Sequence, residues 1–169
     1  VFVNVGKTSA SINVSCVNIT AGEDEIITIE VSPDNFKSEV ILCINGVNNT
    51  VFLNERVNNI TVSGLTNGTY NVSVIFNGND RFFKTNASSS FTVFRGKSNL
   101  EVTVDKNNLT GTVSVKVIPN KCSGLVKLFV NQRNYTAYLN NGKANFNVEF
   151  DRGTNYIYVI YDGDLFHDG

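Results

Sequence analysis

The sequence contains a single histidine, His167, close to the C-terminal end of the chain. Nucleophilic catalysis by a Ser/His/Asp or Cys/His arrangement needs a histidine beside the nucleophile, and one histidine at this place does not supply it. We therefore interpret His167 as a solvated loop residue. We expect no catalytic residue, no cofactor and no enzymatic activity.

An excess of charge of either sign is also absent, because 14 Lys and Arg residues are balanced by 15 Asp and Glu residues. A balanced chain has no basic field for nucleic acid, so we expect no nucleic-acid partner. No apolar run approaches the roughly 18 residues of a membrane-spanning helix, so no membrane span is predicted. The chain begins with Val1, which indicates that either a leader has been removed or the chain is an excised piece.

Residues that favour helices are sparse in this chain. Ala, Leu and Glu are few, whereas Thr, Val, Ile, Phe and Tyr dominate the apolar and semi-polar positions. β-branched and aromatic side chains favour strands, so the composition predicts an all-β protein.

Cysteine and acidic residues show no metal-binding pattern. Cys16, Cys43 and Cys122 are odd in number and lack metal-ligand spacing, and we interpret them as small buried hydrophobes. A Cys16–Cys43 disulfide is the alternative that the sequence leaves open. The acidic segment with Asp162, Asp164 and Asp168 could offer carboxylates to calcium. Turn-forming residues explain it equally well, so we predict no metal site.

One stretch of sequence occurs twice. Residues 67–83, NGTYNVSVIFNGNDRFF, return as residues 152–168, RGTNYIYVIYDGDLFHD, which is a shift of 85 positions. Residues 27–33 are mirrored by residues 113–119 at a shift of 86, and the only two prolines, Pro33 and Pro119, close these segments. Proline has no N–H for a ladder, so each should end a strand.

The beginning of the chain also has a counterpart. Residues 1–7 match residues 91–97 at a shift of 90, and the segments that follow match Ile12 and Val14 with Val102 and Val104. In the second copy Asn141-Gly142 joins two apolar segments and predicts a type I′ hairpin turn.

Each copy therefore has about seven short strands with turn residues between them and no helical period, a pattern that predicts a Greek-key β-sandwich. Tyr70 in Gly68-Thr69-Tyr70 fits the tyrosine corner of such sandwiches, and Asn155 at the aligned place predicts a weaker corner. The fold class is all-β, with two tandem immunoglobulin-like β-sandwich modules. We divide the chain into residues 1–7 (N-terminal strand and linker), 8–95 (module 1) and 96–169 (module 2).

The pattern Gly-Thr-Tyr-x-Val-x-Val-x-Phe-x-Gly-Asn-Asp-x-Phe, followed by Ser-Phe-Thr-Val, resembles the Ig-like repeats of archaeal and bacterial surface adhesin-like proteins, which are abundant in methanogens. Residues 64–93 carry the resemblance well and residues 150–166 carry it in part. The resemblance implies an extracellular protein of the cell surface, in which such repeats are mostly spacers.

The two copies differ in their last strand. Residues 90–93 close the first copy, whereas the chain stops at Gly169 before the second copy reaches the equivalent strand. One explanation is a window cut from a longer array of modules. The other is a polymer subunit in which the N-terminal strand, with Val1, Phe2, Val3 and Val5, enters module 2 of the next copy. Surface filaments built by donor-strand complementation resemble this plan.

Nine asparagines precede x-Ser/Thr and are candidate N-glycosylation sites: Asn13, Asn18, Asn48, Asn59, Asn67, Asn71, Asn86, Asn108 and Asn134. The sequence also leaves undecided whether Lys7, Lys97 or Lys106 forms a spontaneous isopeptide bond with an asparagine. Tyr156 and Tyr158 could face a sugar or a neighbouring molecule.

We therefore expect a structural filament or stalk subunit whose partners are other copies of itself and N-linked glycans. The alternative is a fragment of an adhesin-like protein whose modules act as spacers or bind a carbohydrate or protein on a host, cell or other surface.

Overall fold

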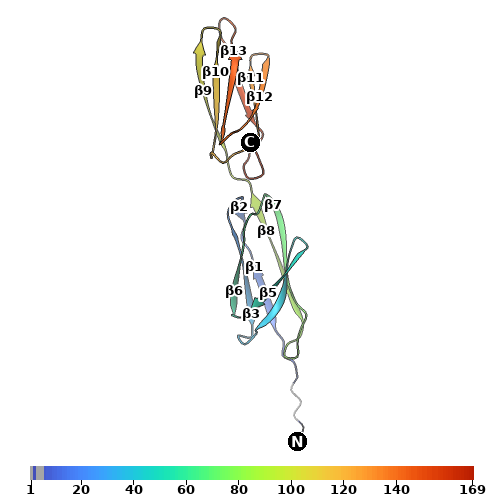
Figure 1. The fold of residues 1–169 in the computed structure, drawn as a ribbon. Helices are drawn as coiled ribbons and strands as arrows, with labels where there is room; N and C mark the ends of the chain where they lie inside the picture. Colours follow the sequence, from blue (N-terminus) through green and yellow to red (C-terminus); the bar gives the residue numbers. More distant parts are fainter. Residues whose placement is uncertain (1, 3–5) are drawn as a thin grey trace. The chain divides into compact units, whose positions relative to one another are not determined.

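The computed structural model describes residue 2 and residues 6–169 (Figure 1). The chain divides into two compact units, Val1–Phe94 and Arg95–Gly169. Val1, Val3 and Val5 of the proposed donor strand lie outside the described residues, and Phe2 is fully exposed. Within the described part, no helix is long and apolar enough to cross a membrane.

The first unit is a sandwich of two sheets (Figure 1). One sheet has the order β1-β3-β6 and the other the order β2-β8-β7-β4-β5. The strands are β1 (Ser11–Ser15), β2 (Ile19–Thr20), β3 (Glu25–Ser32), β4 (Ser38–Ile44), β5 (Val47–Leu53), β6 (Val57–Val62), β7 (Gly68–Phe76) and β8 (Thr85–Phe94).

Alternation of buried and exposed residues builds the core of this unit. On β3 the side chains of Ile27, Ile29 and Val31 are buried, and the residues between them face outward, as the period of two in a strand requires. β3 ends at Ser32, directly before Pro33, as predicted. Both sheets contribute to one core, whose largest fully buried side chains include Phe36, Phe91, Ile27, Ile29, Leu42 and Leu53.

The second unit repeats this plan with two strands fewer, because among the described residues its second sheet has no counterpart of β2 or β8. Its sheets have the orders β13-β10-β9 and β12-β11-β14. The strands are β9 (Asn99–Asn107), β10 (Thr110–Ile118), β11 (Leu125–Val130), β12 (Arg133–Tyr138), β13 (Lys143–Glu149) and β14 (Ile157–Tyr161). β10 ends at Ile118, directly before Pro119, and the core lies between the two sheets. The fold class is thus an all-β pair of immunoglobulin-like sandwiches.

Strand pairing corrects the alignment of the two copies at their first strands. Ile12 faces Val31 across β1 and β3, and Leu100 faces Val117 across β9 and β10. Val31 and Val117 are 86 positions apart and occupy the same place in the repeat, so Ile12 corresponds to Leu100. The shift at this strand is therefore 88 rather than 90. The predicted match of Ile12 with Val102 was wrong because equal alternation makes every even shift look alike.

Candidate functional site

In the first unit, the strand β7 has a neighbour on each side. β4 pairs with one edge, and β8 pairs with the other along the whole length of β7, from Gly68 opposite Val93 to Phe76 opposite Thr85. β8 also places Phe91 and Val93 in the core, where they are 2% and 1% exposed. Both hydrogen-bonding edges of β7 are therefore satisfied.

In the second unit, the equivalent strand β14 pairs with β11 alone among the described residues. Its other edge, which corresponds to the edge of β7 that binds β8, has no ladder partner. A strand edge of this kind presents unpaired backbone N–H and C=O groups and can accept another strand.

Apolar side chains near this edge are more exposed than their counterparts in the first unit. Val74 of β7 is fully buried, whereas its counterpart Val159 on β14 is only partly buried. Val14 on β1 is 7% exposed, whereas its counterpart Val102 on β9 is 41% exposed. We define the open edge as the free side of β14 together with the apolar side chains of β9 and β14 that are partly exposed although their counterparts on β1 and β7 are more buried: Leu100, Val102, Val104, Ile157 and Val159. The open edge is our candidate functional site.

The tyrosine corner next to this edge differs between the units. Tyr70 Oη donates to the carbonyl of Thr66 at 3.0 Å and accepts from its N–H at 3.3 Å, as the sequence predicted. Asn155 makes the same pair of contacts with the backbone of Asp151, at 2.9 and 2.8 Å. The Tyr70 ring stacks on Phe91 of β8 at 5.2 Å. In the second unit, the amide of Asn155 makes the corner.

A second group of side chains gathers at one end of the second unit. Cys122, Asp164 and His167 place one ligand atom each within 4.8 Å of one another, and Cys122 and His167 are buried. The interpretation of His167 as a solvated loop residue was therefore wrong, since His167 is 4% exposed. We also expected that no Cys/His arrangement would form, and this was wrong, because the ligand atoms of Cys122 and His167 lie within 4.8 Å of each other. Residues 45 positions apart in sequence meet only because two loops converge.

Asp164 organises this group through hydrogen bonds. Its Oδ1 accepts from the backbone N–H groups of Phe166 and His167 at 2.8 and 2.7 Å and contacts His167 Nδ1 at 3.0 Å. Its Oδ2 accepts from the N–H and hydroxyl of Ser123 at 2.9 and 3.2 Å. Burial raises the pKa of Asp164, but the N–H donors of Ser123, Phe166 and His167 outweigh it, and the net pKa lies well below its usual range.

This depressed pKa predicts a loss of stability in acid. The stabilisation by the Asp164 carboxylate is complete above its unfolded pKa of about 3.9 and is lost as the pH falls toward the folded value. We expect Asp164→Asn to lower the free energy of unfolding of the second unit by about 1–3 kcal/mol at pH 7 and to flatten its pH dependence between about pH 5 and 2. Urea unfolding followed by circular dichroism measures both.

Asp162→Asn is the matched control for this prediction. Asp162 pairs with Lys127 at 2.6 Å, but both side chains are substantially exposed, so its loss should cost less than about 1 kcal/mol. Equal acid sensitivity in the parent and in Asp164→Asn would contradict the assigned role. Asp162 and Asp164, two of the three carboxylates that the sequence offered to calcium, thus have different protein partners.

The surroundings of Cys122 disfavour ionisation of its thiol. Burial is the main cause that raises the pKa of Cys122, so the neutral thiol predominates near pH 7. Cys122 is a buried small residue, as predicted, whereas Cys16 and Cys43 are only partly buried. All three cysteines are free, so the alternative of a Cys16–Cys43 disulfide is not realised.

The other sequence-predicted residues lie on the surface. All nine candidate glycosylation asparagines are exposed, which glycosylation requires but does not by itself establish. Lys7, Lys97 and Lys106 are exposed, so none is the buried lysine that an isopeptide bond needs. Tyr156 and Tyr158 are 77% and 64% exposed.

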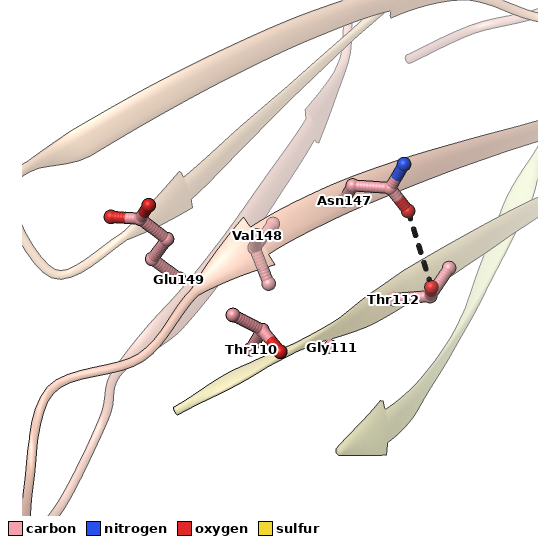
Figure 2. A pocket seen from close by; sticks show the side chains of 6 residues that line it. All are labelled: Thr110, Gly111, Thr112, Asn147, Val148 and Glu149. Carbon is pink, nitrogen blue, oxygen red and sulfur yellow. Dashed lines mark hydrogen bonds between the residues drawn. The ribbon is translucent and has the colours of Figure 1, made fainter. Parts of the chain in front are cut away.

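Residues of the paired strands β10 and β13 line a surface depression of about 420 Å³. Figure 2 shows the side chains of these residues. Thr112 donates a hydrogen bond to the side chain of Asn147 there at 3.3 Å, and Glu149 is the only ionisable residue among the lining residues. A single carboxylate without a second titratable group among these lining residues offers no acid–base pair.

Comparison with known proteins finds no matching family model and no matching curated protein. Among solved structures, the chain is similar to the fibronectin(III)-like modules of Clostridium thermocellum CbhA, with 15% identity, a TM-score of 0.41, and coverage of 92% of this chain and 87% of that one. It is also similar to the chicken CNTN1 FN1–FN3 domains, with 12% identity, a TM-score of 0.32, and coverage of 92% and 58%. Parabacteroides merdae β-glucuronidase matches with 14% identity, a TM-score of 0.31, and coverage of 88% and 23%. Likenesses this distant carry no argument about function.

Proposed function

We propose that the chain is a non-enzymatic structural subunit of an extracellular filament or stalk. In this proposal the open edge of the second module is completed by residues 1–5 of another copy. The observation that carries the proposal is the open edge itself: among the described residues, β14 has no partner like the one that β8 is to β7, and the apolar side chains that such a strand would cover are partly exposed.

The corrected alignment supports the choice of donor. At a shift of 88, Val3 and Val5 correspond to Phe91 and Val93, since 3 + 88 = 91 and 5 + 88 = 93. Phe91 and Val93 are the residues of β8 that are buried in the first module. By analogy with β7 and β8, Val3 would lie opposite Asn155 and Val5 opposite Gly153. Alternation then turns Phe2 away from the core.

The donation of a strand from one copy to the next determines whether the assembly is closed or grows as a fibre. One copy gives its first residues and receives a strand at its second module, so the two contacting surfaces are different. A heterologous contact of this kind propagates into a fibre unless its rotation closes a ring. Each valine that the added strand buries would contribute up to about 1.5–2 kcal/mol, and its ladder bonds would satisfy the free edge of β14.

Two rearranged chains test the proposal. Deleting residues 1–6 is expected to abolish filaments in electron micrographs. Placing the same residues after Gly169 through a short flexible linker is expected to give a monomer, because each copy then completes its own second module. Filaments formed equally by both variants would refute donation by these residues.

Point substitutions provide a matched control for the same experiment. Val3→Asp and Val5→Asp place a charge on the inward face of the donated strand and should prevent assembly. Phe2→Asp changes a neighbouring residue on the outward face, and its assembly should be close to that of the parent. Equal loss in all three variants would indicate a general effect of charge.

The exposed Tyr156 and Tyr158 favour a second candidate, in which the chain is a spacer or adhesin module that contacts a sugar or a protein. In that case the open edge would be filled by residues following Gly169 in a longer chain. Glycan-array binding by a monomer that is lost in Tyr156→Ala and Tyr158→Ala would support it.

A further inference from the structure

The Cys122 group replaces an aromatic cluster of the first unit, position by position. Equivalent backbone bonds establish the correspondence. Phe36 donates its N–H to the carbonyl of Pro33 at 2.8 Å, and Cys122 donates to Pro119 at 3.0 Å. Asn79 donates to the carbonyl of Phe82 at 3.1 Å, and Asp164 donates to His167 at 2.9 Å.

The side chains at these equivalent positions differ in chemistry. In the first unit the rings of Phe36 and Phe82 lie 5.3 Å apart and close one end of the core. In the second unit, both rings are replaced by metal-ligating side chains, Cys122 and His167, and the loop amide of Asn79 is replaced by the carboxylate of Asp164. Asn79 Oδ1 accepts from the N–H groups of Arg81 and Phe82 at 2.9 Å, so Asp164 keeps the turn role of the residue it replaces. Apolar packing is served by the two phenylalanines, so their replacement by Cys122 and His167 calls for another explanation.

The geometry points to a site for one divalent transition-metal ion of the zinc type, with Cys122, Asp164 and His167 as its protein ligands. Thiolate, imidazole and carboxylate are zinc ligands, whereas calcium and magnesium prefer oxygen alone. Three protein ligands leave a fourth tetrahedral position for water.

The spacing of the donor atoms suits one ion after a small adjustment. Ligand atoms on a tetrahedral zinc ion lie about 3.3–3.8 Å apart, given bond lengths of about 2.0–2.3 Å. The ligand atoms of the three residues lie within 4.8 Å of one another, and His167 Nδ1 and Asp164 Oδ1 are 3.0 Å apart. The ion would take the place of the proton between these two atoms, and Ser123 would keep Asp164 Oδ2 in position.

The surroundings of the site offer the ion a route from solvent, and they let the proton of the Cys122 thiol leave. A surface depression of about 330 Å³ borders the site and includes Ser123 and Asp164 among its lining residues. The Cys122 thiol must release its proton to solvent when the sulfur binds the ion, so the apparent affinity should rise with pH. A bound ion would tie the loop after β14 to the loop before β11, next to the end of the open edge.

Cobalt is the probe that reports on the ligands directly. The full-length chain, with its thiols reduced, is titrated with Co²⁺ at pH 7.5 and then with Zn²⁺. We expect one ion per chain, visible bands of tetrahedral Co²⁺, a near-ultraviolet charge-transfer band from thiolate to cobalt, and loss of both on addition of Zn²⁺. Absence of the thiolate band would overturn the proposal.

Variants assign the ligands. Cys122→Ser should remove the thiolate band, and His167→Phe, which copies Phe82, should weaken Co²⁺ binding about 100-fold while circular dichroism shows an intact fold. Cys43→Ser is the matched control and should bind like the parent. A thiolate band that persists in Cys122→Ser, or one that disappears in Cys43→Ser, would also overturn the site. Assembly is not needed for this measurement, so its result is independent of the filament test.

Discussion

Val14→Asp is expected to destabilise the first module by on the order of 4 kcal/mol, because it buries a charge without a partner. Val102→Asp, at the equivalent place in the second module, is expected to change the stability of the isolated chain by about 1 kcal/mol or less. Val14 is 7% exposed beneath the edge that β8 covers, whereas Val102 is 41% exposed beside the open edge. An aspartate at residue 102 keeps its hydration, and only its low strand propensity is unfavourable.

The pair of variants measures the open edge without assuming what fills it. Urea unfolding of each variant, followed by circular dichroism, gives the two differences in free energy. Val102→Asp should then prevent assembly although its own fold is intact, since the added strand would bury the charge. Equal destabilisation by the two substitutions would show that residue 102 is covered within a single chain, and the open edge would have to be abandoned.

Leu128→Ala is expected to remove a large part of the stability of the second module. Leu128 on β11 is fully buried, and truncation of a buried leucine costs about 2–5 kcal/mol. A unit of this size has a stability of about 4–11 kcal/mol, and an edge of β14 that is free among the described residues places this unit toward the lower end of that range. The melting temperature of the second unit should fall by at least about 10 °C.

Two control variants test whether the effect depends on the position of Leu128 or would follow from truncating any leucine. Leu125→Ala changes a partly exposed position on the outward face of the same strand and should cost less than about 1 kcal/mol. Leu42→Ala, the equivalent change in the complete first module, should leave that module mostly folded. Calorimetry resolves the two outcomes. A smaller effect at Leu128 than at Leu42 would mean that the second module is the more stable one.

Much of the fold follows from local sequence. Alternation of apolar and polar residues predicted the strands, and Pro33 and Pro119 end β3 and β10 because proline cannot donate to a ladder. Tyr70 predicted its own corner, since the bond spans only four residues. The turn at Asn141-Gly142 was also predicted, and both residues have positive φ. Its flanking strands β12 and β13 nevertheless belong to different sheets, which no local pattern indicates.

The sequence by itself thus determined the strands, their turns and the repeat, because these depend on side-chain alternation and backbone preferences over a few residues. Only the tertiary structure decided the register of the first strands, the partial exposure of Val102, and the meeting of Cys122 with His167. These features depend on which distant segments pack together, and packing between distant segments leaves no period in the sequence.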